Sequence, residues 1–112
     1  MVEITYITIL ITGSSEEEAG RIGKTLVEEK LVACANIIPK IRSIFSWKGE
    51  ICDENEVLMI LKSKGSLFQQ IKKRVKTLHS YDVPEIIALP IHSGSEDYLR
   101  WIDEVTNDHS AS

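Results

Sequence analysis

The stretch LVACANIIPKIRSIFSWKGEICDENEVLMILK, residues 31–62, decides the fold of this chain. It predicts two β-strands joined by a tight turn at Lys48-Gly49, because Gly49 can adopt the positive φ that a two-residue hairpin loop requires. Each arm would hold about 14 residues and extend about 45 Å at ~3.3 Å per residue. A domain of 112 residues has a diameter of only about 30 Å. We therefore expect the hairpin to extend beyond its own domain.

The outer half of this hairpin carries the large apolar side chains Ile44, Phe45, Trp47 and Ile51. In an isolated chain they would be exposed to water, and a long exposed strand edge promotes pairing with other chains. We therefore expect the protein to work as an oligomer, with Phe45, Trp47 and Ile51 in the interface between copies.

Composition limits the class of protein. The chain length fits one domain, and 43% hydrophobic residues are enough for a single core. With 13 Lys and Arg against 17 Asp and Glu, the net charge is −4, which argues against a nucleic-acid partner. No apolar run approaches the ~20 residues of a membrane span, and the N-terminus does not resemble a signal peptide. We expect one domain over residues 1–107, followed by a frayed tail at residues 108–112.

The two cysteines, Cys34 and Cys52, are expected to be free thiols. With the turn at Lys48-Gly49, Cys34 would pair with Ser63, and the two cysteines would lie about 36 Å apart along the hairpin. A disulfide needs Cα atoms within ~7 Å of each other. Free thiols without an export signal predict a cytoplasmic protein.

Hydrophobic periodicity predicts the remaining elements. Residues 2–12 are almost continuously apolar or β-branched, which is typical of a central strand buried on both faces. Helices are predicted from about residue 15 to 30, from 66 to 79 and from 96 to 106, with a short strand over residues 85–91. This βαββαβ order plus a C-terminal helix predicts an α+β protein with a ferredoxin-like split βαβ sandwich.

Some single residues carry local predictions. Ser66 and Gln69 match a capping box, and the first helix offers two, Ser14 with Glu17 and Ser15 with Glu18. Gly20 and Gly23 are expected to let the first helix approach the sheet closely. Pro39 interrupts the first arm of the hairpin, which predicts an edge strand or a β-bulge.

Four blocks of sequence resemble the CutA family of divalent-cation tolerance proteins. They are EEKLVACANIIP at residues 28–39, WKGEI at 47–51, HSYDVPEIIALPI at 79–91 and, more weakly, YLRWI at 98–102. The resemblance implies a ferredoxin-like fold, a tight trimer formed through the long hairpin, and an architecture similar to that of PII signalling proteins. It also implies a link to metal tolerance, copper binding in some members, and, for mammalian relatives, an association with acetylcholinesterase anchoring. No catalytic reaction is implied.

The resemblance extends to copper ligands at two positions. In copper-binding relatives one cysteine lies in the ACANIIP block, a second ends strand one, and a histidine lies in the HxYxxPE block. Cys34 and His79 match, but the strand-one position aligns with Ile11 or Thr12, which are poor copper ligands. We therefore expect at most a weak site for copper or another divalent cation. The alternatives are that Cys34 is a small buried hydrophobe and that His79 caps the second helix.

A second group of candidate residues defines a cleft. His79, Tyr81 and Glu85 fall within seven residues, and Lys62 would add a cation if it faced the same place. We expect Lys62, Tyr81 and Glu85 to line a ligand-binding cleft between subunits, suited to a small anionic or metal ligand. The alternative is a structural network in which Glu85 pairs with a lysine and Tyr81 caps the loop. The nearby acidic run of Asp53, Glu54 and Glu56 has the charge to attract hard cations, but paired strands rarely wrap an ion, so we expect a solvated edge.

The sequence thus predicts a trimeric, non-enzymatic binding protein for a small ligand or a divalent metal such as copper. It would act in metal tolerance and signal by contact with a protein partner whose identity the sequence does not give. Two alternatives stay open. One is a structural assembly module, and the other is an enzyme that uses Cys34, His79 or Glu85.

Overall fold

Four strands and three α-helices follow one another along residues 4–108, the part of the chain that this computed structural model describes. In order, they are β1 (Tyr6–Gly13), α1 (Glu16–Glu28), β2 (Cys34–Trp47), β3 (Glu50–Lys64), the 3-10 helix η1 (Gly65–Leu67), α2 (Phe68–Leu78), β4 (Ile86–Pro90) and α3 (Glu96–Val105). The predicted order is confirmed. Residues 2 and 3 of the predicted first strand and residues 109–112 of the predicted tail lie outside the described residues.

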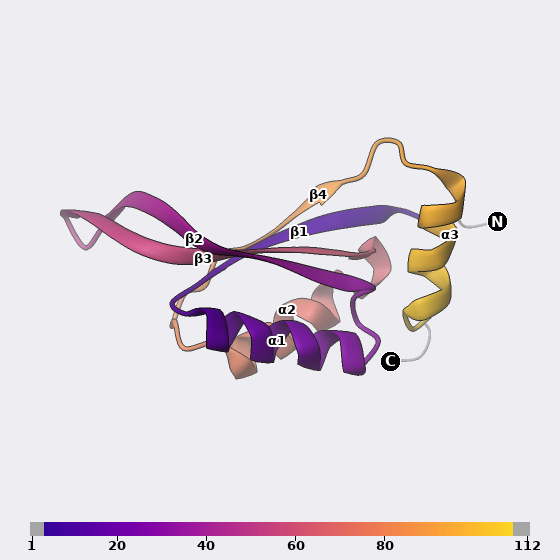
Figure 1. Cartoon of the computed structure of the whole chain (residues 1–112), viewed down its shortest axis with the longest axis horizontal. Helices are drawn as coiled ribbons and strands as arrows, with labels where there is room; N and C mark the ends of the chain where they lie inside the picture. Colours follow the sequence, from indigo (N-terminus) through magenta and orange to yellow (C-terminus); the bar gives the residue numbers. More distant parts are fainter. Residues whose placement is uncertain (1–3, 109–112) are drawn as a thin grey trace.

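The four strands form one antiparallel sheet in the order β2-β3-β1-β4. This is the ferredoxin-like arrangement that the sequence predicts. Helices α1 and α2 lie on one face of the sheet, and α3 lies at the end remote from the hairpin turn (Figure 1). Among the described helices, none combines the length and the apolar character that crossing a bilayer requires.

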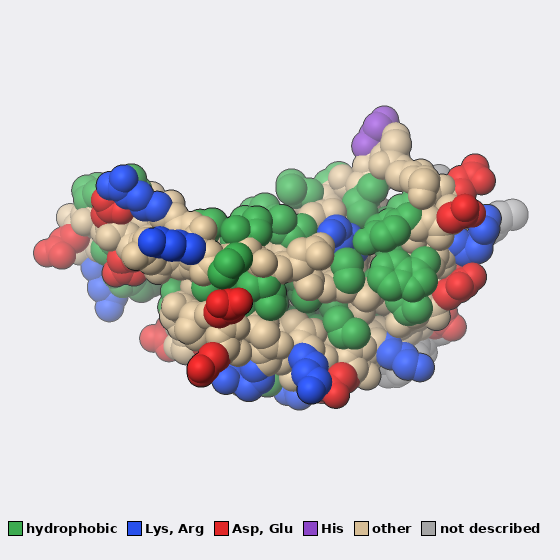
Figure 2. Space-filling view, viewed as in Figure 1, with side chains coloured by type: hydrophobic (Ala, Val, Ile, Leu, Met, Phe, Trp, Pro, Cys, Tyr) green, Lys and Arg blue, Asp and Glu red, His purple; other side chains and the backbone are tan. Residues whose placement is uncertain are grey.

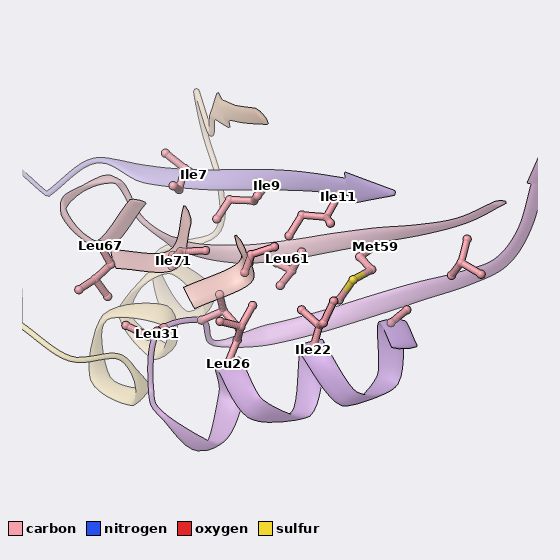
Figure 3. Close-up of a cluster of buried hydrophobic side chains, with 14 residues drawn as sticks. Ile7, Ile9, Ile11, Ile22, Leu26, Leu31, Met59, Leu61, Leu67 and Ile71 are labelled. Carbon is pink, nitrogen blue, oxygen red and sulfur yellow. The ribbon is translucent and has the colours of Figure 1, made fainter. Parts of the chain in front are cut away.

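The hydrophobic core lies between the sheet and the two helices that cover it (Figure 3). In β1, Ile7, Ile9 and Ile11 are buried in this core, whereas Thr8 and Leu10 on the opposite face are only half-buried. The prediction of a central strand is confirmed, but burial on both faces is wrong for the single chain. The reason is that α1 and α2 cover only one side, so alternate residues of β1 stay on the open face.

The hairpin turns where the sequence predicts. Lys48 and Gly49 both have positive φ, 49° and 83°, and Trp47 pairs with Glu50 across the turn. Strands β2 and β3 contain 14 and 15 residues, and the hairpin dominates the longest dimension of the chain, 49 Å (Figure 1).

A register shift interrupts β2 between Ile38 and Ile41. Ile38 pairs with Leu58 and Ile41 with Glu56, so β2 holds one residue more than β3 at Pro39. This extra residue confirms the β-bulge expected at Pro39, and the position of β2 at the edge of the sheet confirms the expected edge strand.

The extra residue in β2 also moves the predicted pairing of the strands by one position. Cys34 lies opposite Lys62, and the predicted partner Ser63 is wrong. The prediction assumed an unbroken ladder from the turn, and a β-bulge offsets every pair beyond it.

Beyond the bulge, the hairpin is a two-stranded ribbon. β1 pairs with β3 only as far as Val57, so residues 50–56 of β3 pair with β2 alone. We call residues 41–56 the outer ribbon. Its apolar side chains are exposed in the single chain, with 63% of Ile44 and 78% of Ile51 accessible to solvent. Figure 2 shows charged side chains beside apolar ones on the ribbon at the left of the molecule.

The predicted capping boxes have different outcomes. The box at Ser14 and Glu17 is wrong, because Ser15 is the N-cap and Ser14 donates its hydrogen bonds to Glu18. Ser15 is the N-cap of α1, and its Oγ accepts a hydrogen bond from the backbone N–H of Glu18 at 3.1 Å. The box at Ser66 and Gln69 is wrong. Ser66 lies within η1, α2 begins at Phe68, and its first turn has no side-chain cap.

Helix α1 approaches the sheet closely at one of its two glycines. A Cβ atom added at Gly23 would lie 3.0 Å from the Cβ of Ala35, whereas one added at Gly20 would have no neighbour within 4 Å. The expected close approach is therefore confirmed for Gly23 and wrong for Gly20.

Two alanine substitutions in α1 should have opposite effects. Gly20→Ala should raise the free energy of unfolding by up to about 1 kcal/mol, because alanine favours the helix and the position is open. Gly23→Ala should lower it by about 1–3 kcal/mol, because the new methyl group meets the Cβ of Ala35, which cannot rotate away. Urea unfolding measures both changes, and a gain in stability from Gly23→Ala would contradict the close approach.

Candidate functional site

A groove of about 640 Å³ lies between the outer ribbon and the loop that follows α2. Its lining residues are Thr12, Ser43, Ile44, Phe45, Trp47, Cys52, Glu54, Glu56, Tyr81, Asp82, Val83 and Glu85. Four of these residues carry carboxylates, and the lining contains no Lys, Arg or His from the described part of the chain. The groove therefore combines aromatic and aliphatic walls with a negative charge.

Tyr81 connects the loop to the ribbon. Its hydroxyl donates a hydrogen bond of 2.8 Å to Oε2 of Glu56, which lies at the first pair beyond the bulge. Burial, together with this bond and the negative charge of Glu56, raises the pKa of Tyr81 well above its ordinary value. The phenol thus keeps its proton and acts as a donor. The expected placement of Tyr81 in a cleft is supported, and its partner is a carboxylate of β3.

His79 is buried beneath Tyr81, and both of its ring nitrogens have backbone partners. Nε2 lies 2.7 Å from the carbonyl oxygen of Thr12, and Nδ1 accepts a hydrogen bond of 3.0 Å from the backbone N–H of Tyr81. This pattern is that of a neutral imidazole with its proton on Nε2. The ring also packs against Tyr81, with 4.7 Å between the ring centroids. In this arrangement neither nitrogen has a free lone pair for a metal ion.

Glu18 of α1 also holds the loop that follows α2 in place. Its Oε1 accepts hydrogen bonds from the backbone N–H and the hydroxyl of Ser14, and its Oε2 accepts one from the backbone N–H of Ser80 at 2.9 Å. Burial alone would raise the pKa of Glu18, but the hydrogen bonds from Ser80 and Ser14 outweigh it, and the pKa is lowered. A buried carboxylate therefore stays charged and joins the start of α1 to the loop after α2.

Cys34 and Lys62 lie toward the other end of the sheet. They are opposite each other on β2 and β3; Sγ of Cys34 is 3.6 Å from the hydroxyl of Tyr98, and Nζ of Lys62 donates to Oδ1 of Asn36. Lys62 also pairs with Thr8 of β1.

The sheet register separates these residues from the groove. His79 bonds to Thr12, four residues beyond Thr8, a step of about 13 Å along the strand. One chain therefore does not bring Cys34 to His79, nor does it place Lys62 among the residues that line the groove with Tyr81 and Glu85. Within residues 4–108, no three His, Cys, Asp or Glu side chains are grouped so that they could hold a metal ion.

The acidic run on β3 is exposed at Asp53 and Glu54, as the sequence predicts, and half-buried at Glu56. Asp53 pairs with Arg42 across the ribbon at 2.6 Å, while Glu54 and Glu56 also line the groove. The period of two along a strand places residues 52, 54 and 56 on one face, so the predicted strand alone is enough to group them. No local pattern, by contrast, indicates that Glu18 reaches Ser80 or that Glu56 reaches Tyr81.

Comparison with known proteins gives consistent matches over nearly the whole chain. The family described as CutA1 divalent ion tolerance protein matches residues 7–105. A divalent-cation tolerance protein CutA from Thermus thermophilus is 50% identical over 98 residues, which are 88% of this chain and 95% of that protein. One from Archaeoglobus fulgidus is 48% identical over 86% of this chain and 93% of its own length.

Solved structures agree with the sequence comparison. The divalent cation tolerance protein (Cut A1) from Thermus thermophilus superposes with a TM-score of 0.89 at 48% identity, covering 91% of this chain and 99% of that one. CutA1 from Oryza sativa superposes with a TM-score of 0.91 at 38% identity, covering 94% and 96%.

Glu18→Gln should make the stability of the protein less dependent on pH. At pH 7 we expect a loss of about 1–3 kcal/mol, because the new NH₂ group would face an N–H donor. The lowered pKa of Glu18 stabilises the fold above about pH 4.5, and this contribution disappears as pH falls through the folded pKa. The difference between Glu18→Gln and wild type should therefore shrink toward pH 3 in urea unfolding.

The exposed neighbour Glu17 provides the matched control for this experiment. Glu17→Gln should cost less than about 1 kcal/mol at pH 7, because the exposed Glu17 makes only the helix-dipole interaction of a first-turn carboxylate. An equal loss from Glu18→Gln at pH 7 and at pH 3 would contradict a charged, hydrogen-bonded Glu18.

Proposed function

Because the chain belongs to the CutA1 family of divalent ion tolerance proteins, we propose that it is a trimeric binding protein that responds to divalent cations. Its relatives are named as tolerance proteins rather than as enzymes. In this proposal the cation or a small ligand occupies the groove beside Tyr81, and the assembled protein passes the signal on by contact with a protein partner.

The observation that carries the proposal is the charge of the groove. Glu54, Glu56, Asp82 and Glu85 all line it, and the described lining offers no cation to neutralise them. A cleft lined by one sign of charge concentrates ions of the opposite sign, and hard divalent cations prefer oxygen ligands. Since three metal-ligating side chains do not meet within residues 4–108, an ion bound here keeps part of its water shell or takes ligands from a second copy.

Copper(I) is a soft ion, and it needs different ligands from the hard divalent cations that suit the groove. Copper(I) favours thiolate and imidazole ligands, and the family resemblance gives these roles to Cys34 and His79. In one chain the two residues lie apart and both ring nitrogens of His79 have backbone partners, so a copper site would have to displace one of those partners and draw further soft ligands from a neighbouring subunit. Cys34 and Cys52 are both free and half-buried, which suits the cytoplasmic location that the sequence predicts.

The outer ribbon supports assembly. Exposed apolar side chains on the ribbon, including Phe45, Trp47 and Ile51, and others on the open sheet face, including Ile87 and Leu89, would be covered when copies pack together. The number three comes from the family resemblance. The resemblance to the PII architecture likewise supports signalling by contact rather than by catalysis.

The two alternative functions have less support. A purely structural assembly module would give no reason for a groove of this volume lined by unneutralised carboxylates. An enzyme would need a nucleophile beside a base, and the described hydrogen-bond contact of the Cys34 thiol is with the phenol of Tyr98.

Removing two groove carboxylates should weaken cation binding. For the double variant Glu54→Gln/Glu85→Gln we expect the affinity for Zn²⁺ or Mn²⁺ to fall about tenfold or more, on the order of 1 kcal/mol for each charge removed. Titration calorimetry measures the affinity.

A second pair of acidic residues, remote from the groove, controls for net charge. Glu96→Gln/Glu104→Gln on α3 makes the same change in charge and should bind like wild type. Cys34→Ser and His79→Ala, titrated with copper(I), test the soft site separately. Equal affinities in the groove variant and wild type would remove the groove from the proposal.

Placing a charge on the outer ribbon should dissociate the trimer. Ile51→Asp would have to bury a carboxylate against a neighbouring copy, so we expect smaller species in sedimentation velocity at micromolar concentration. Val27→Asp on α1 is the control, because Val27 is an exposed apolar residue remote from the ribbon and should not affect assembly. A well-folded wild-type monomer under these conditions would contradict the proposed assembly.

A further inference from the structure

Three hydrogen bonds in series connect the body of the protein to the outer ribbon. The first joins the carbonyl oxygen of Thr12 at the end of β1 to Nε2 of His79, and the second joins Nδ1 of His79 to the backbone N–H of Tyr81. The third runs from the hydroxyl of Tyr81 to Glu56 on the ribbon. The chain of contacts thus passes from a central strand, through a buried ring, to the base of the ribbon.

The bond between Tyr81 and Glu56 is the last in this series, and it connects the outer ribbon to the rest of the described structure. Among the hydrogen bonds of residues 4–108, it is the one side-chain bond that joins the outer ribbon to the rest of the chain. The other side-chain bonds of the ribbon, between Arg42 and Asp53, stay within it. Because β1 stops pairing with β3 at Val57, backbone pairing to the body also ends just before Glu56.

We propose that His79 is a positioning residue that holds Tyr81 so that its phenol sets the direction of the outer ribbon. The buried imidazole offers one donor and one acceptor, and both are used to fix the loop on β1. Tyr81 on the loop and Glu56 on the ribbon both line the groove, so this connection also forms part of the groove wall.

This role differs from metal ligation. A metal ion at Nδ1 would have to replace the N–H of Tyr81, and one at Nε2 would have to replace the carbonyl of Thr12. Either replacement would release the loop. The role goes beyond the proposed function, because it holds whether or not a cation occupies the groove.

Hydrogen–deuterium exchange of the metal-free, assembled protein tests the proposal. We expect Tyr81→Phe and His79→Ala each to accelerate exchange in residues 41–56 by roughly tenfold, as loss of a hydrogen bond to a charged group predicts. The double variant should exchange no faster than the faster single variant, because both changes break one series. Glu56→Gln should have a smaller effect, since its amide oxygen still accepts from the phenol.

A conservative variant separates positioning from simple loss of the fold. His79→Asn keeps an acceptor near the position of Nδ1 and should restore much of the slow exchange that His79→Ala loses. His92→Ala and Tyr98→Phe make the same chemical changes away from the ribbon and should leave its exchange unchanged. Exchange in Ile7–Ile11 of β1 reports on the core.

Two results would overturn the proposal. One is unchanged exchange of the ribbon in Tyr81→Phe, and the other is His79→Asn exchanging as fast as His79→Ala. Because no metal is present in this experiment, a failure of cation binding in the groove would leave its outcome unaffected.

Discussion

The structure depends on a mismatch of length between neighbouring strands. β3 has 15 residues and its central partner β1 has 8, so the sheet cannot pair the outer part of β3 with anything but β2. An isolated two-stranded ribbon is marginally stable in water. Its exposed apolar side chains therefore favour contact with other copies, and its base becomes the place where the loop after α2 attaches. Both the groove and the expected assembly follow from this one constraint.

The site residues divide into two groups with different chemistry. Around the groove, carboxylates and a protonated phenol surround a space without a described positive charge. At the other end of the sheet, Cys34 of β2 lies opposite Lys62 of β3, and its thiol contacts the phenol of Tyr98 on α3. Helix α3 is joined to β3 by the 2.9 Å ion pair of Lys64 and Asp103. The proposed cation site is the first group, because hard divalent cations prefer oxygen ligands and negative charge.

Local chemistry made most of the fold predictable from the sequence. Gly49 located the turn, Pro39 indicated the bulge, and Ser15 marked the start of α1. The site was predictable only in part, since its decisive contacts join residues far apart in the chain. Glu18 and Ser80 meet across 62 positions, and Glu56 and Tyr81 across 25. Glu18, Ser80 and Tyr81 lie outside the strands, so these contacts depend on how α1 and the loop after α2 pack against the sheet. Local sequence patterns do not specify that packing.

The bulge at Pro39 has a consequence for how this hairpin can change in evolution. Before the bulge, even-numbered residues of β2 share the open face with Leu58, and after it the odd-numbered residues, including Phe45 and Trp47, share the face of Glu56. While the bulge stays at Pro39, loss or gain of a single codon between the bulge and the turn would reverse this parity and turn aromatic rings to the opposite side. Lineages can therefore lengthen or shorten this arm in steps of two residues, or by moving the bulge itself.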